Sequence, residues 1–99
     1  MPDGDFFGRV AEAALRNSTA VLNRILPGGT QKGREYVALN PNRSDTKPGS
    51  FKINVDTGRW ADFATNDQGG DLISLTAYLY RMRQLEAAER LADMLGVRK

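Results

Sequence analysis

The chain has 99 residues, of which 40% are hydrophobic and 26% are charged, and its formal net charge is +2. This length suits one domain with a single core, and the charge balance is ordinary for a globular protein. The chain contains no cysteine and no histidine, which excludes disulfides, thiol nucleophiles, Ser/His/Asp triads and zinc sites built from Cys or His. No apolar run approaches the length of a membrane span, and residues 1–7 lack the basic start of a signal peptide, so we expect a cytoplasmic protein.

The N-terminal part of the chain, from about Asp5 to Leu26, has the pattern of an amphipathic helix. Asn17-Ser18-Thr19 interrupts the pattern, which is compatible with one long helix or with two helices separated by a break. Pro27-Gly28-Gly29 predicts a firm end. The hydrophobic residues that recur at helical spacing are Phe7, Val10, Ala14, Val21, Leu22 and Ile25.

The middle of the chain has the pattern of a small antiparallel sheet. Residues 36–39 predict a first strand, and residues 40–49 a polar loop rich in turn formers. Apolar and polar residues alternate over 51–55, which predicts a half-buried second strand. Residues 56–58 predict a tight hairpin turn, whose glycine is free to take a positive φ, and residues 59–64 the return strand.

The last third of the chain predicts an αα-hairpin. Asp71 is expected to be the N-cap of the first helix, and Gly96 the left-handed residue that ends the second. The fold class is therefore α+β: an N-terminal helix, a three-stranded antiparallel sheet and a C-terminal αα-hairpin. We expect a single domain, 1–99, with an N-terminal helical segment at 1–29, the sheet at 34–65 and the helical hairpin at 70–96.

Four short motifs follow one another between Asn40 and Leu95. They are the loop Asn40-Pro41-Asn42-Arg43, the strand start Lys47-Pro48-Gly49-Ser50-Phe51, the helix cap Gly69-Gly70-Asp71 and the helix Glu86-Ala87-Ala88-Glu89-Arg90-Leu91-Ala92. Each motif alone recurs by chance, but their order and spacing together resemble the N-terminal CHC-type zinc ribbon of bacterial and phage DNA primases. The additional N-terminal helix resembles the arrangement in toprim-primase and replication proteins of mobile elements.

The metal ligands of that family are missing, so the resemblance implies a degenerate zinc finger, a zinc-ribbon-like sheet without zinc. The family's first ligand pair falls on Asn40 and Arg43. The second pair falls on Asp62 and Thr65 or, with a one-residue shift, on Phe63 and Asn66. These residues supply neither thiolate nor imidazole, and we predict no metal and no cofactor.

Other contacts have to replace the folding energy that a structural zinc supplies. We expect Arg43 to pair with Asp62 where the metal would lie. We also expect a hydrophobic set from the sheet to pack against both helical blocks: Tyr36, Leu39, Phe51, Ile53, Val55, Trp60 and Phe63.

Basic residues around the predicted sheet are the candidates for nucleic-acid binding, with one tryptophan as a surface for stacking bases. The set is Arg34, Arg43, Lys47, Lys52, Arg59 and Trp60. On charge alone, a solvated surface is the competing interpretation. For Trp60 the competing interpretation is a core residue, and burial preferences favour it.

The resemblance implies a metal-free, DNA-binding module of a phage or mobile-element primase or replication protein, which holds single-stranded or template DNA. The alternative is a protein-interaction module that docks a replication partner, such as a helicase or a toprim primase domain. Neither function involves a membrane. We expect no enzyme activity from this chain itself, because its acids do not converge and it has no toprim or Walker motif. It is either the N-terminal accessory domain of a longer primase or an accessory protein that acts alone.

Overall fold

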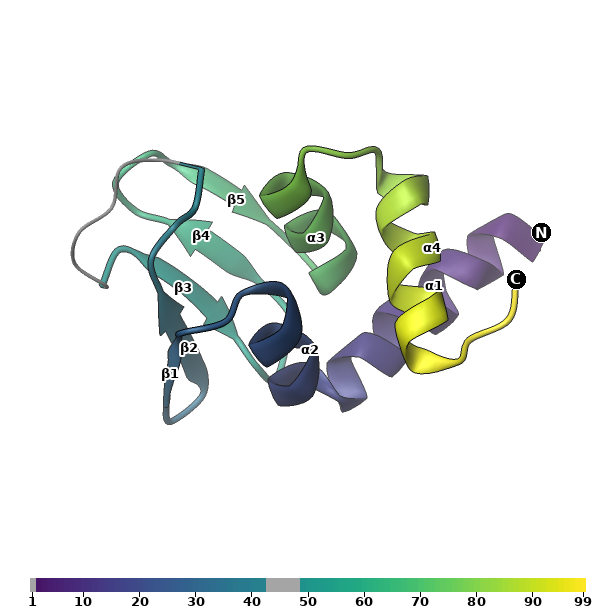
Figure 1. The fold of residues 1–99 in the computed structure, drawn as a ribbon, viewed down its shortest axis with the longest axis horizontal. Helices are drawn as coiled ribbons and strands as arrows, with labels where there is room; N and C mark the ends of the chain where they lie inside the picture. The colour runs from purple at the N-terminus through teal and green to yellow at the C-terminus, as the bar shows by residue number, and fades with distance from the viewer. Residues whose placement is uncertain (1, 43–48) are drawn as a thin grey trace.

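The computed structural model describes residues 2–42 and 49–99. Figure 1 shows the sheet at one end of the molecule, with α2 and α3 beside it, and α1 and α4 at the other end together with both termini. No helix within the described residues is long and apolar enough to cross a membrane. In chain order these residues form α1 (Pro2–Arg16), α2 (Ser18–Ile25), β1 (Thr30–Lys32), β2 (Glu35–Ala38), β3 (Phe51–Asn54), β4 (Trp60–Asp62), β5 (Asp67–Gly69), α3 (Leu72–Tyr80) and α4 (Gln84–Leu95).

The N-terminal segment is two helices with a break at Asn17, so the single N-terminal helix of the expected fold class is wrong. The Asn17 side chain donates a hydrogen bond to the Ala13 carbonyl, 2.8 Å away, and so satisfies one carbonyl at the end of α1. Ser18, the first residue of α2, is buried, and its hydroxyl donates to the Val55 carbonyl at 2.9 Å. This contact ties the break between the helices to the end of β3.

The sheet is an antiparallel meander of five strands within the described residues, in the order β1-β2-β3-β4-β5. The prediction of three strands is therefore wrong, because both edge strands were missed. All three residues of β1 are exposed, and β5 is also largely exposed. Backbone hydrogen bonds to β2 and β4 hold these two strands in the sheet, and a hydrophobic pattern does not reveal such bonds.

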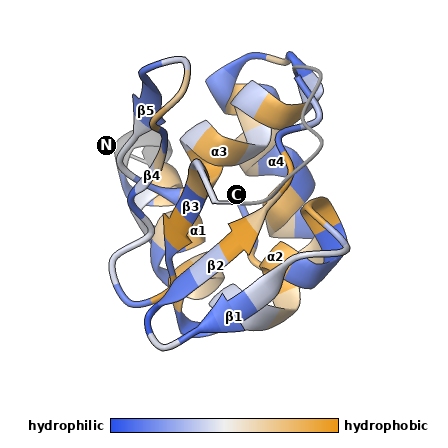
Figure 2. Ribbon diagram, turned by 90° about the vertical axis from the view of Figure 1, so that its left-hand side faces the viewer, coloured by the Kyte–Doolittle hydropathy of each residue, from blue (hydrophilic) through white to orange (hydrophobic). Residues whose placement is uncertain are grey.

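The two faces of the sheet differ in chemistry. Along β3, Phe51 and Ile53 are buried, whereas Lys52 and Asn54 are only partly covered. Trp60 and Asp62 of β4 are also buried on the inner face, which α2 and α3 cover. Hydrophilic and hydrophobic residues are interspersed along the strands in Figure 2, as this alternation requires. The inner face forms the core, and the outer face meets solvent.

Two members of the predicted hydrophobic set are not in the core. Leu39 is 45% exposed and Phe63 is 69% exposed, whereas the other five members are buried. Leu39 follows the last residue of β2, beyond the last pairing with β3. Phe63 follows the last residue of β4, in the turn after the strand, and so does not pack on the inner face.

The αα-hairpin is present as predicted, and so is its capping. The Asp71 side chain accepts a hydrogen bond from the Ser74 backbone N–H at 2.8 Å, and the Ser74 hydroxyl faces the Asp71 backbone N–H at 3.4 Å. Together these contacts form a capping box at the start of α3. Gly96 ends α4 with a φ of 72°, and the hairpin glycine Gly58 has a φ of 80°.

Replacing the cap of α3 tests how much this helix start contributes to stability. Asp71→Ala removes the acceptor of the Ser74 N–H and is expected to lower the free energy of unfolding by about 1 kcal/mol. Asp93→Ala is the matched control, because Asp93 is exposed on α4 and forms no ion pair with a described residue. Urea unfolding of the two variants measures the difference, and equal stability would show that the capping box contributes nothing.

Candidate nucleic-acid interface

A buried group of polar side chains joins the loop after β2 to β4 and α3. The Asn40 side-chain amide donates to Asp62 Oδ2 and to the Tyr78 hydroxyl, both at 2.8 Å. Asn40 is 1% exposed and Asp62 is 0% exposed. We call Asn40, Asp62 and Tyr78 the polar junction.

Further hydrogen bonds extend the polar junction into both loops. The other Asp62 oxygen, Oδ1, accepts from the Ala64 backbone N–H at 2.8 Å, and Asn40 Oδ1 accepts from the Asn42 N–H at 2.9 Å. The Tyr78 hydroxyl donates to Asp67 Oδ2 at 2.7 Å. No buried side-chain nitrogen or oxygen of the described residues lacks a partner. The junction is a satisfied network, which is the condition for buried polar groups to stabilise a fold.

Asn40 and Asp62 are two of the positions on which the sequence resemblance places metal ligands, and they do not fit zinc. The Asn40 atom that faces Asp62 is an N–H donor, which repels a cation, and the chain has no thiolate or imidazole. Within residues 2–42 and 49–99, no three acidic residues gather in a group that could hold a metal ion. Arg43, the predicted partner of Asp62, lies outside the described residues.

Side chains on the outer face of the sheet form an aligned strip over β3 and β4. Lys52 lies opposite Ala61, and Ala61 lies opposite Gln68 of β5. Beyond these pairs, the Phe63 N–H donates to the Ser50 carbonyl at 2.8 Å and the Asn54 N–H donates to the Arg59 carbonyl at 2.7 Å. Arg59 precedes β4, Ala61 lies within it and Phe63 follows it, so the strip runs the length of this strand.

This strip lies in a shallow groove of about 520 Å³ on the outer face, which we call the outer groove. Phe63 presents the most exposed large hydrophobic side chain of the described residues, at 69%. The sequence contained a signal for this exposure, because Arg59 and Phe63 are an even number of positions apart in the predicted return strand, which places them on the same face of it. The residues that line the groove are Glu35, Lys52, Asn54, Arg59, Trp60, Ala61, Phe63, Gln68, Gly69 and Gly70.

The two cations of the outer groove are in different electrostatic settings. Lys52 Nζ lies 3.8 Å from a Glu35 carboxylate oxygen, and both side chains are partly exposed. An exposed pair of this kind is weak and exchanges readily with another anion. Arg59 is exposed and forms no ion pair with any described residue. Arg59 is therefore the cation of the groove that is free to meet a phosphate.

Trp60 does not offer a surface for stacking bases, so the stacking role predicted for it is wrong. Trp60 is 5% exposed, and its ring packs on Tyr78 with 4.7 Å between ring centroids. Its indole N–H donates to the Ser74 hydroxyl at 3.0 Å, which fixes the ring under the start of α3. Trp60 belongs to the core beneath the outer groove, and Phe63 is the aromatic residue that the groove exposes.

The remaining predicted site residues do not join this strip. Arg34 is 81% exposed at its side chain and pairs with Asp56 at 3.3 Å, beside the hairpin turn. It does not line the outer groove. Lys47, like Arg43, lies outside the described residues. The structure thus brings together Lys52 and Arg59, above Trp60, and leaves Arg34 apart from them.

Comparison with known proteins identifies the fold. The chain superposes on a solved structure titled as the primase of Aquifex aeolicus, zinc binding and RNA polymerase domains, with a TM-score of 0.72. The two chains are 18% identical in sequence, and the match covers 92% of this chain and 21% of that one. No protein-family model matches the chain, and no curated protein matches it.

The likeness establishes a primase-like zinc-ribbon fold over nearly the whole chain. At this sequence identity it establishes the fold alone. It also shows that the helices at both ends of the chain belong to the shared architecture, because the superposition extends well beyond the sheet. The present chain corresponds to about a fifth of the length of the solved primase chain.

Removing one hydroxyl from the polar junction tests its contribution. Tyr78→Phe leaves the Asn40 amide and the Asp67 carboxylate with one partner fewer, and we expect the free energy of unfolding to fall by about 1–2 kcal/mol near neutral pH. Burial, followed by the nearby carboxylates, raises the pKa of Tyr78 above its ordinary 10.0. The neutral phenol is thus favoured in the folded state.

This shift also gives the stability difference a pH dependence. The stabilisation from Tyr78 is fully present below the unfolded-state pKa of about 10 and is lost as pH rises through the higher folded-state pKa. Urea unfolding of the parent and of Tyr78→Phe, from neutral to alkaline pH, measures the difference between their free energies of unfolding, which we call the gap. Titration of other groups affects both proteins equally and cancels in this gap. A gap that stays constant above about pH 10 would contradict the role of the Tyr78 hydroxyl.

Proposed function

We propose that this chain is a nucleic-acid-binding module that holds single-stranded or template DNA on the outer face of its sheet. The observation that carries the proposal is the exposed Phe63 ring on the same sheet face as Lys52 and Arg59. An exposed aromatic ring stacks on a base of any sequence, and neighbouring cations hold the phosphates. Along the aligned strip, one extended DNA strand could make both the stacking contact and the phosphate contacts.

The weak net charge of the chain agrees with a local site rather than a broad basic surface. The formal net charge is +2, so long-range attraction of DNA is modest. Glu35 also lines the outer groove and pairs with Lys52, which keeps binding weak until a phosphate replaces that carboxylate. We expect an affinity that depends on stacking by Phe63 as much as on charge.

The fold supports a place in DNA replication. The solved neighbour is titled as a primase, and we propose a corresponding accessory role for this chain in a phage or mobile-element replication protein of the cytoplasm. The module itself performs no catalysis in this proposal. Its contribution is to position template for a partner that carries the chemistry.

We also propose that the module folds without a metal. The polar junction links the two loops that a zinc ion would link in a zinc ribbon, and it does so by hydrogen bonds between Asn40, Asp62 and Tyr78. The donor set of the chain lacks the ligands that hold structural zinc.

A second candidate function is docking of a replication protein. The observation that favours it is an open groove between α2, α3 and α4, on a different part of the surface from the outer groove.

Binding of labelled single-stranded DNA, followed by fluorescence anisotropy at low and moderate salt, tests the main proposal. Phe63→Ala is expected to weaken binding by roughly five- to a hundredfold, as for the loss of one stacked base. Arg59→Gln is expected to weaken it and to lower the salt slope by about one. The matched control is Arg98→Gln, which removes one charge near the C-terminus, at the end of the molecule away from the sheet.

Two outcomes would overturn this proposal. One is binding that survives both Phe63→Ala and Arg59→Gln unchanged. The other is an equal loss on Arg98→Gln, which would mean that DNA responds to net charge rather than to the outer groove. Duplex DNA in the same assay shows whether the site prefers unpaired bases.

Chelation tests the metal-free proposal. The thermal unfolding midpoint is expected to be the same with and without EDTA, because no ion contributes to the folding free energy. Elemental analysis of the purified protein is the independent control. A fall in the midpoint with EDTA that added zinc restores would contradict the proposal.

A further inference from the structure

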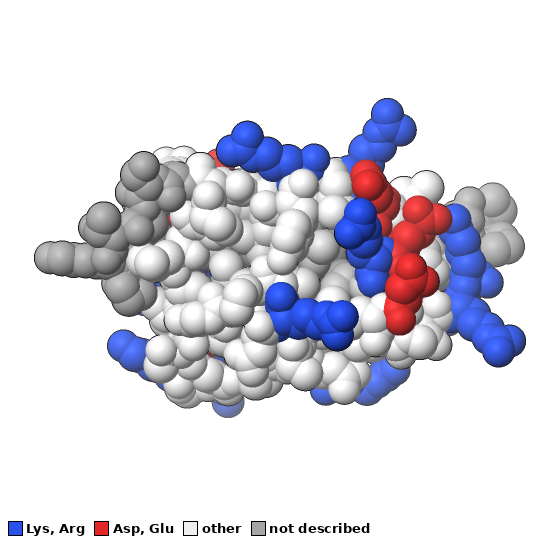
Figure 3. Space-filling view, in the orientation of Figure 1, with Lys and Arg blue, Asp and Glu red and all other residues white. Residues whose placement is uncertain are grey.

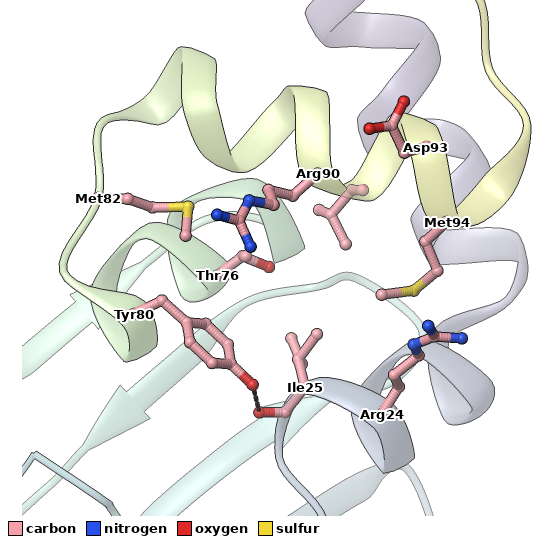
Figure 4. A pocket seen from close by; sticks show the side chains of 9 residues that line it. Arg24, Ile25, Thr76, Tyr80, Met82, Arg90, Asp93 and Met94 are labelled. Carbon is pink, nitrogen blue, oxygen red and sulfur yellow. Dashed lines mark hydrogen bonds between the residues drawn. The ribbon is translucent and has the colours of Figure 1, made fainter.

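A groove opens on the helical part of the molecule, between α2, α3 and α4, with a volume of about 420 Å³. Its apolar walls come from all three helices and from the turn between α3 and α4: Ile25, Tyr80, Met82, Leu91 and Met94. Figure 4 shows the thioethers of Met82 and Met94 on opposite sides of the opening. We call this hollow the helical groove.

The helical groove continues past Tyr80 into a second apolar hollow. The two hollows share Ile25 and Tyr80, and the second extends to Leu39 and Pro41 with a volume of about 480 Å³. The Tyr80 hydroxyl donates to the Ile25 carbonyl at 2.8 Å, which holds the ring between the hollows. Leu39 and Tyr80 are 45% and 51% exposed. Together the hollows form a long apolar depression, suited to an extended or helical peptide rather than to a compact ligand.

Two arginines give the helical groove a positive charge. Arg24 from α2 and Arg90 from α4 both line it, and neither forms an ion pair or a hydrogen bond with a described residue. In Figure 4 the Arg24 guanidinium lies beside Met94, and the Arg90 guanidinium lies over Thr76 near Met82. The cations thus stand at two separate points of the groove, with apolar side chains near each.

Acidic residues of α4 lie near one of the two cations, since Arg90 also lines a neighbouring hollow together with Glu86, Glu89 and Asp93. Asp93 also lines the helical groove, but in Figure 4 the Asp93 carboxylate points away from Arg24 and Met94. Figure 3 shows acidic side chains over α4, with Lys and Arg side chains on both sides of them. An occupant of the groove therefore meets thioether and aliphatic side chains and the Tyr80 ring, flanked by two guanidinium groups that form no ion pair with a described residue.

We propose that the helical groove docks an acidic amphipathic peptide segment of a protein partner. Apolar side chains of the segment would fill the floor between Met82 and Met94, and its carboxylates would pair with Arg24 and Arg90. Flexible methionines adapt to such side chains, and guanidinium groups bind carboxylates in a fixed geometry. Tyr80 is the aromatic residue of the groove walls, and its hydroxyl is held by the Ile25 carbonyl, whereas Met82, Leu91 and Met94 offer thioether and aliphatic surface. This inference rests on the docking alternative and is independent of the outer groove, with which the helical groove shares no residue.

The test uses the full chain and a short synthetic fluorescent peptide in which leucines at helical spacing alternate with glutamates. Saturable binding is expected, with amide chemical-shift changes in α2, the end of α3 and α4. The double variant Arg24→Gln, Arg90→Gln is expected to weaken binding at least about fivefold. Met94→Gln is expected to weaken binding because it removes an apolar contact from the floor of the groove. The matched control Lys52→Gln, Arg59→Gln removes the same charge from the outer groove and should leave peptide binding unchanged. Circular dichroism of each variant establishes that it is folded.

Four results would overturn the inference. Equal binding of a peptide with glutamine in place of glutamate would show that charge plays no role. Shifts confined to the sheet place the peptide elsewhere. Loss of single-stranded DNA binding on Arg24→Gln, Arg90→Gln assigns the groove to nucleic acid. Self-association of the parent that this variant abolishes assigns it to a second copy of the chain, whose α4 carries the exposed acids Glu86 and Asp93. Failure of DNA binding in the outer-groove variant alone affects only the proposed nucleic-acid function.

Discussion

One buried hydrogen bond, from the Asn40 amide to the Asp62 carboxylate, holds the loop after β2 against the end of β4. Because Tyr78 bonds to the same amide, α3 is tied to both. Each such bond adds little net stability, but a buried carboxylate without its partner is costly, so the three side chains favour one arrangement of the loops and α3. The burial of Asp62 agrees with the alternation of β4, in which Trp60 and Asp62 face the core. Phe63 follows in the turn after the strand and lines the outer groove.

This arrangement separates two surfaces with different chemistry. The outer groove combines an exposed aromatic ring with Lys52 and Arg59 on a flat sheet face. The helical groove combines thioether and aliphatic side chains and the Tyr80 ring with Arg24 and Arg90. Stacking on flat bases requires the first kind of surface, and packing of aliphatic side chains requires the second. The proposed nucleic-acid contact and the proposed peptide contact therefore use different faces of the chain.

The hydrophobic pattern of the sequence was sufficient for the fold class, the three central strands and the helical hairpin. Local chemistry was sufficient for the cap at Asp71 and the positive φ of Gly58 and Gly96. It was not sufficient for β1 and β5, whose residues are mostly exposed and which are held by backbone hydrogen bonds to their neighbours. It also misplaced Leu39 and Phe63, which lie just beyond the last residues of β2 and β4, because their hydrophobic character outweighed the signal that the spacing of Phe63 from Arg59 offered.

The sequence by itself determined that this chain combines helices with an antiparallel sheet and lacks the ligands of a zinc ribbon, because residue types and their spacing are local properties. The tertiary structure decided how the loop after β2 is joined to β4 and α3, since the contact of Asn40 with Asp62 and Tyr78 joins residues far apart in the chain. It also decided which aromatic residue is exposed, by burying Trp60 against Tyr78 and leaving Phe63 in solvent. Both grooves arise in the same way, from side chains that only the packing of separate strands and helices brings together.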